Sequence, residues 1–234
     1  MRLPTFAVVC VYLVVCLHTG QAHSYLTEEQ ERAKFNLSSF VWNFTNKVYH
    51  LGNSHVTSLE LQDNQALGTL PNGGSGQRNA VFQPCTLLQP HVHPRGNKFA
   101  HVLYGKFLFA LAEENGGRTF SQVATAGQTV VIPQGLLHSF HNDFCEPAAF
   151  VDFYATSDPG IQTAWSALIK MPDSIILAST GMSAEQLLDL RENFPGGPFS
   201  YDYECALRCN ITDIKSSPSA PPPGAAPYPS DTGA

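Results

Sequence analysis

Apolar and polar residues alternate in short runs through the middle of the chain, from about residue 55 to residue 155. Alternation with a period of two is typical of strands that bury one face. Turn-forming residues separate the runs, among them the loop expected at 71–79 and the hairpin turn Asn115-Gly116-Gly117. The pattern predicts strands at 55–62, 80–91, 98–104, 106–112, 118–124, 128–132, 137–143 and 147–155. Many short strands joined by turns favour an all-β sandwich or barrel.

Helical signals lie on both sides of this β-rich region. Thr27-x-x-Gln30 and Ser183-x-x-Gln186 are capping boxes that each predict the start of a helix. Asp158-Pro159 predicts another helix start, with an N-cap followed by proline at the first helical position. The expected segments are a signal peptide (1–22), an N-terminal extension (23–50), the barrel (51–157), a C-terminal helical segment (158–209) and a Pro-rich disordered tail (210–234).

The first 22 residues have the composition of a cleaved secretory signal. Arg2 precedes an apolar run at 6–17, and Gly20-Gln21-Ala22 offers small residues for cleavage. The run is too short to span a membrane, so the chain is expected to be secreted and extracellular, without a membrane anchor. Loss of Arg2 would change the formal net charge from −6 to about −7. An acidic chain without a basic stripe is not expected to bind nucleic acid.

Four cysteines remain after the predicted signal, namely Cys85, Cys145, Cys205 and Cys209. In an oxidising compartment an even number of cysteines predicts disulfide bonds, and three pairings are open. A zinc site built from all four thiolates is the alternative, although their spacing is wrong for zinc knuckles. Secretion would also make the three Asn-x-Ser/Thr sequons candidates for glycosylation, at Asn36, Asn43 and Asn210.

Three histidines form the main candidate site. His91 and His93 lie at positions i and i+2 of a predicted strand, so their side chains share one face. His138 follows a Pro-x-Gly turn at the start of another predicted strand. Neutral imidazoles that converge from two strands are typical ligands for a first-row divalent transition metal.

These histidines also carry a family resemblance. Gly127-x5-Pro133-x-Gly135-x2-His138-x3-Asn142 resembles the second germin-type cupin motif, and His91, His93 and Gly105 match fixed positions of the first. The chain is therefore similar to germin-like and spherulin-like proteins of the cupin superfamily. The resemblance implies a cupin jelly-roll β-barrel with a C-terminal α-helical extension, a manganese-type metal site, a motif role for Asn142 around it, and a tendency to form homo-oligomers.

The resemblance also implies a disulfide pairing. In the cupin jelly roll, the strand of the first motif pairs with the strand after His138. Setting residue 91 opposite 138 or 139 would bring Cys85 near Cys145, with a bulge near Asn142, and would leave Cys205 to pair with Cys209.

Lys98 departs from the germin pattern at the position of its fourth metal ligand, a glutamate. A lysine ammonium has three donors and no lone pair, so it cannot ligate a metal unless it is deprotonated. A positive charge about 5 Å from a divalent ion costs roughly 7 kcal/mol at an effective dielectric near 20. We expect Lys98 to point into the site, or else to extend its ammonium to solvent at the barrel mouth.

Three functions remain open at this point. The first is a metal-dependent oxidoreductase that resembles oxalate oxidase or superoxide dismutase. The second is a metal-binding protein without turnover. The third is a metal-free storage, wall or binding protein in which Lys98 takes the place of the metal. The family implies manganese, whereas three imidazoles without a carboxylate favour zinc or copper. The small-molecule ligand is not identified by the sequence.

Overall fold

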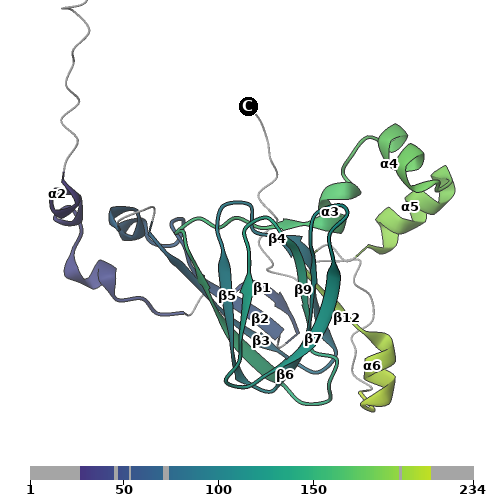
Figure 1. The fold of residues 1–234 in the computed structure, drawn as a ribbon, viewed down its shortest axis with the longest axis horizontal. Helices are drawn as coiled ribbons and strands as arrows, with labels where there is room; N and C mark the ends of the chain where they lie inside the picture. Colours follow the sequence, from purple (N-terminus) through teal and green to yellow (C-terminus); the bar gives the residue numbers. More distant parts are fainter. Residues whose placement is uncertain (1–26, 45–46, 53, 71–73, 195–196, 212–234) are drawn as a thin grey trace, which may run out of the picture. The chain divides into compact units, whose positions relative to one another are not determined.

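The computed structural model describes residues 27–44, 47–52, 54–70, 74–194 and 197–211 (Figure 1). The predicted signal peptide, and the expected disordered tail beyond residue 211, lie outside the described residues. The chain divides into two compact units, residues 1–35 and 36–234. Within the described ranges, every helix is too short or too polar to cross a membrane.

In the first unit, helix α2 (Glu28–Arg32) begins at the predicted capping box. The Thr27 hydroxyl accepts a hydrogen bond from the backbone N–H of Gln30, at 3.3 Å. The Gln30 side chain in turn accepts one from the backbone N–H of Thr27, at 2.8 Å. Both contacts satisfy N–H groups that have no partner within the helix, and they confirm the predicted start.

The second unit is a two-sheet β structure, as the alternating pattern predicts. One sheet has the strand order β1 (Lys47–Leu51), β2 (Ser54–Leu59), β3 (Gly76–Phe82), β10 (Ala148–Tyr154), β5 (Lys98–Tyr104) and β8 (Thr129–Ile132). The other has the order β11 (Gln162–Thr163), β4 (Thr86–Val92), β9 (Leu137–His141), β6 (Lys106–Ala112) and β7 (Thr119–Thr125), and β12 (Phe199–Tyr201) also pairs with β4. All of these pairs are antiparallel, so the all-β prediction is confirmed.

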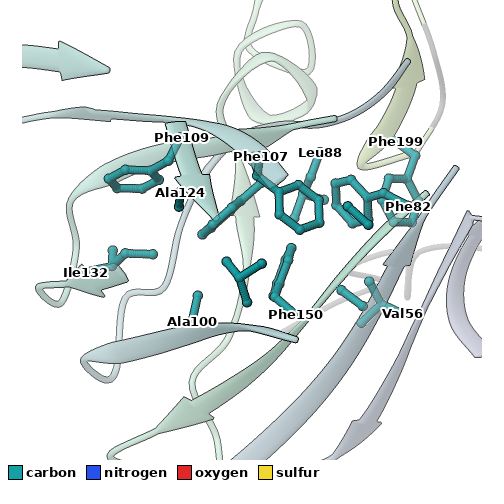
Figure 2. Close-up of a cluster of buried hydrophobic side chains, with 14 of the residues drawn as sticks. Val56, Phe82, Leu88, Ala100, Phe107, Phe109, Ala124, Ile132, Phe150 and Phe199 are labelled. Atoms are coloured by element: carbon teal, nitrogen blue, oxygen red, sulfur yellow. The ribbon is translucent and has the colours of Figure 1, made fainter. Parts of the chain in front are cut away.

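Aromatic side chains from the two sheets meet in one core. Phe82 and Phe150 come from the first sheet, whereas Phe107 and Phe140 come from the second. Figure 2 shows Phe82, Phe107 and Phe150 together with smaller residues of the same cluster. The Phe82 and Phe107 rings meet edge to face, with centroids 5.2 Å apart. Burying each such ring contributes about 1.5–3 kcal/mol, so this cluster holds the two sheets together.

The predicted strand at 80–91 is wrong, because the chain leaves one sheet and enters the other within it. β3 already begins at Gly76, inside the predicted loop, and ends at Phe82, and β4 begins at Thr86. Between them Cys85 adopts a positive φ of 61°, which turns the backbone sharply. The buried Asn142 amide fixes this crossing by donating to the carbonyl of Gln83, at 3.0 Å, and to those of Phe82 and Glu146.

The predicted helix at Asp158-Pro159 is also wrong. Residues 158–161 are irregular, and Gly160 has a φ of 64°, outside the range of a right-handed helix. The helices that follow are α3 (Ala164–Leu168), α4 (Asp173–Thr180), α5 (Ala184–Asn193) and α6 (Tyr203–Arg208), and short 3₁₀ turns lie at η1 (Leu37–Phe40) and η2 (Gln65–Thr69). The capping box at Ser183 does open α5, as predicted. The segment 158–209 therefore contributes strands β11 and β12 as well as helices.

All four expected cysteines form disulfides, but the predicted pairing is wrong. Cys85 is bonded to Cys205 and Cys145 to Cys209. The reason is the path of the C-terminal segment: β12 pairs with β4, and the backbone N–H of Asp202 then donates to the carbonyl of Cys85 at 2.9 Å. Helix α6 thus begins beside Cys85. Cys205 in this helix and Cys209 at its C-cap are four residues apart, and each is bonded to a different barrel cysteine.

Candidate metal centre

The structure brings the three predicted histidines together inside the barrel. His91 lies on β4, His93 follows that strand directly, and His138 lies on β9, which pairs with β4 (Figure 1). His91 is opposite His138 in the strand register, as expected, although the bulge lies between Leu88 and His91 instead of near Asn142. The three side chains are buried, and one nitrogen of each lies within 4.8 Å of the others.

The turn before β9 holds the two histidine segments against each other. Gly135 has a φ of 78°, which suits a residue without a side chain, and its N–H donates to the carbonyl of His93 at 3.0 Å. The Gln134 side chain donates to the carbonyl of Pro94 at 2.8 Å. The Pro-x-Gly sequence therefore positions His138 by hydrogen bonds to the backbone around His93.

Each imidazole is oriented by its Nδ1 atom. His91 Nδ1 lies 2.8 Å from the carbonyl oxygen of Gln89, and His138 Nδ1 lies 2.9 Å from that of Leu136. His93 Nδ1 contacts the carbonyl oxygen of Gly160 in the same way. A carbonyl only accepts, so in each case the proton is on Nδ1 and the Nε2 lone pair is unprotonated. This is how protein backbones commonly orient histidine ligands for a metal.

Burial keeps all three imidazoles neutral. It lowers the pKa of His138 to about 3, with the Lys98 charge acting in the same direction. Burial is also the main cause that lowers the pKa of His91 and His93 far below the ordinary value, and Lys98 and the neighbouring imidazoles add to it. Metal ligation needs neutral imidazoles, so the three histidines have at neutral pH the protonation state that a metal site requires.

We predict that the metal-free protein loses stability as the pH falls below about 6.5. The unfolded chain takes up protons on these histidines at their ordinary pKa, whereas the folded chain does not until a much lower pH. Each histidine then lowers the free energy of unfolding by about 1.4 kcal/mol per pH unit. Urea unfolding between pH 7 and pH 5 measures this slope. A slope that is unchanged in His138→Leu would contradict the account.

Lys98 points into the barrel and does not extend to solvent. Its side chain is 1% exposed, and its Nζ lies 2.9 Å from Asp152 Oδ2. The ammonium also lies over the Phe140 ring, 4.8 Å from its centroid. Burial lowers the pKa of Lys98 and raises that of Asp152, and the charge of each opposes the shift of the other. The alternative that Lys98 reaches solvent at the barrel mouth is therefore wrong.

A hydrogen-bonded chain connects this ion pair with the histidines. The Tyr154 hydroxyl donates to Asp152 Oδ2 at 3.1 Å and lies 3.4 Å from His93 Nε2. Arg78 forms a second buried ion pair with Glu60, and its guanidinium lies over the Tyr154 ring. The interior thus holds two pairs of opposite charges beside three neutral imidazoles.

Sequence reasoning missed Asp152 and Tyr154, although the pattern around them carries a signal. In β10, Asp152 and Tyr154 are buried like the apolar residues around them, and Phe153 is the one exposed residue of the strand, at 47%. A carboxylate at a core-facing position of an apolar strand needs a buried cation, and Lys98 on the adjacent strand β5 supplies it. The hydrogen bonds of Asn142 go to the backbone of the sheet crossing, so its place in the motif is structural.

Comparisons with known proteins identify the fold. The sequence model of the cupin family matches residues 45–187, more than half of the chain. Spherulin-1A of Physarum polycephalum is 33% identical over 133 residues, which are 56% of this chain and 54% of that protein. The chain thus spans about half the length of the spherulins it matches. Oxalate oxidase 1 of Hordeum vulgare is 28% identical over 166 residues, covering 66% of this chain and 81% of that protein.

A solved structure gives the same result. Oxalate oxidase in complex with the substrate analogue glycolate superposes with a TM-score of 0.61 and 25% identity, over 68% of this chain and 82% of that one. Germin-like protein 3-5 of Oryza sativa subsp. japonica is 30% identical over 150 residues, 62% of this chain and 65% of that protein. The jelly-roll architecture, the three buried histidines and the matched region agree, and the chain belongs to the cupin family as a germin- and spherulin-like member.

Proposed function

We propose that this protein is a secreted cupin that binds one divalent transition metal through His91, His93 and His138. The observation that carries the proposal is the orientation of the three rings, whose Nδ1 protons are all engaged by backbone carbonyls. His138 Nε2 is buried and has no hydrogen-bond partner among the described residues. A buried nitrogen lone pair without a donor is costly for the protein alone, and a metal ion would satisfy it.

The donor set favours zinc or copper over manganese. Within the described part of the chain, the cluster around the three imidazoles includes no carboxylate oxygen. Imidazole suits zinc and copper, whereas manganese prefers hard oxygen ligands. The buried ammonium of Lys98 adds a repulsive charge for any cation. We therefore expect the affinity to rank copper and zinc above manganese.

Titration of the metal-free protein with each ion tests this proposal. We expect one zinc or copper ion per chain. In His93→Ala the affinity for the ion should fall about tenfold or more, because one of the three ligands is removed. His101→Ala is the matched control, since His101 lies on β5 and contacts Thr129 through its Nδ1. Equal binding in both variants would show that the ion binds away from His93, and no binding in the wild type would favour a metal-free role in storage or in the cell wall.

An oxidoreductase activity is the second candidate, and the similarity to oxalate oxidases favours it. A metal bound by the three histidines would supply Lewis acidity and a site for a small oxygen-containing ligand. The chain itself would exclude bulk water, because His91, His93, His138 and Lys98 are all at most 2% exposed. Oxalate consumption and superoxide removal by the metal-loaded protein, compared with His93→Ala, test this activity.

Secretion is part of the proposal, and the two disulfides support it. Bonds such as Cys85–Cys205 and Cys145–Cys209 form and persist in oxidising compartments. The three sequon asparagines, Asn36, Asn43 and Asn210, are exposed, as glycosylation requires. N-terminal sequencing and glycosidase treatment of protein recovered from the medium would test cleavage after Ala22 and glycan attachment.

A further inference from the structure

Within the described residues, Asp152 uses only one of its two carboxylate oxygens for hydrogen bonds and ion pairing. Its side chain is buried on β10, with Oδ2 contacted by both Lys98 Nζ and the Tyr154 hydroxyl. Its Oδ1 has no hydrogen-bond partner among the described residues. Burying a carboxylate costs free energy, and apolar side chains of similar volume in place of a buried ion pair often leave a protein equally or more stable. The position therefore points to a role in the site that the fold alone does not require.

The Tyr154 hydroxyl has one proton and two competing acceptors. Asp152 Oδ2 lies 3.1 Å from the hydroxyl oxygen, and His93 Nε2 lies 3.4 Å from it. The His93 proton is held on Nδ1 by the carbonyl of Gly160, so Nε2 presents a lone pair. If Tyr154 donated its proton to that lone pair, His93 would be less available as a metal ligand.

Lys98 decides which acceptor is stronger. An ionised carboxylate accepts a hydrogen bond more strongly than a neutral imidazole, and the ammonium at 2.9 Å stabilises the ionised form of Asp152. The shorter contact of Tyr154 to Asp152 agrees with this order. The four side chains thus form one series, from Lys98 through Asp152 and Tyr154 to His93.

We propose that Asp152 is a positioning residue of the metal centre, which holds the Tyr154 proton away from His93 Nε2 and so keeps that ligand free. This inference rests on the proposed function, because it concerns the same three histidines. It also gives Lys98 a constructive role, since the lysine keeps Asp152 in the accepting form. Asp152 acts on the metal through Tyr154 and not as a ligand itself.

A double-mutant cycle on metal affinity tests the proposal, with zinc as the probe and the full chain as the protein. Asp152→Asn should weaken zinc binding about tenfold or more, the range for residues that orient a metal ligand. In a Tyr154→Phe background the same substitution should change the affinity less than about threefold, because no hydroxyl proton remains to compete. Equal losses in the two backgrounds would overturn the proposal.

A second measurement needs no Asp152 variant and therefore remains informative even if those variants fold poorly. In the metal-free wild type, ¹⁵N NMR of labelled imidazoles should show His93 Nε2 as an unprotonated nitrogen without a donor, and Tyr154→Phe should leave its resonance unchanged. A large shift in Tyr154→Phe would show that Tyr154 donates to His93, and would overturn the proposal. If the wild type binds no zinc at all, the proposed function fails, and the role of Asp152 at a metal centre fails with it. If the wild type binds zinc but the double-mutant cycle is additive, only the proposed role of Asp152 is rejected, and the proposed function stands.

Discussion

Lys98→Glu is expected to destabilise the metal-free protein by about 3–5 kcal/mol, because it breaks a buried ion pair. The new carboxylate would stand where Lys98 Nζ now lies 2.9 Å from Asp152 Oδ2, and two buried like charges cannot both remain ionised at that separation. Urea unfolding at pH 7 measures the loss. Lys98→Met is the control, since it removes the cation without adding a second anion.

The pH dependence of this variant has a definite sign. The two carboxyls in folded Lys98→Glu would have raised pKa values, so the folded state takes up a proton more readily than the unfolded state. The difference in free energy of unfolding between the wild type and Lys98→Glu should therefore become smaller as the pH falls from 7 toward 5. A difference that stays constant or widens over this range would show that position 98 does not face Asp152.

Although Lys98→Glu should lower the stability of the protein, it should strengthen the binding of manganese. Lys98→Glu replaces a repelling cation by an oxygen ligand at the position where the germin motif has glutamate, so manganese affinity should rise above that of the wild type. Lys98→Glu/Asp152→Asn should lose less stability than Lys98→Glu, because only one carboxylate then remains. Full manganese occupancy in the wild type, unchanged by Lys98→Glu, would mean that Lys98 has no influence on the ion.

Removal of the Cys85–Cys205 disulfide is expected to lower the free energy of unfolding by about 2–5 kcal/mol. Both cysteines are fully buried, and the bond joins residues 120 positions apart, so it restricts the unfolded chain over much of its length. Cys85→Ala/Cys205→Ala avoids placing a hydroxyl in the core. Thermal and urea unfolding of this variant against the wild type measure the effect.

The second disulfide supplies an internal comparison. Cys145 is exposed, and the Cys145–Cys209 bond joins residues only 64 positions apart. We expect Cys145→Ala/Cys209→Ala to lose less stability than the first pair, and mild reductant to open this bond first. If the two double variants are equally destabilised, burial and separation do not decide the contribution of these bonds. Peptide mapping without reduction would reveal any other pairing.

Much of the barrel could be predicted from the sequence because its determinants are local. A strand with one buried face shows its period of two in any short window, and β5 and β6 follow that pattern closely. His91 and His93 share a face for the same reason. The hairpin at Asn115-Gly116-Gly117 is also local, and β6 and β7 pair across it.

The features that were missed depend on contacts between distant segments. Nothing near Cys85 in the sequence shows that β12 will pair with β4 and bring helix α6 to it. The partner of Lys98 lies 54 positions away on β10, and strand order decides that they meet. Asp158-Pro159 matches a helix start, yet Gly160 instead bends the chain so that its carbonyl accepts from His93. In each case tertiary contacts override a local signal.

The most direct test of the three-histidine centre is anomalous diffraction from crystals grown with zinc or copper, recorded at the absorption edge of the metal. The account predicts one strong anomalous peak among the Nε2 atoms of His91, His93 and His138, at about 2.0–2.1 Å from each nitrogen. Lys98 should remain paired with Asp152 in the same map. An absence of any peak at the histidines, with the metal bound elsewhere or not at all, would contradict the account.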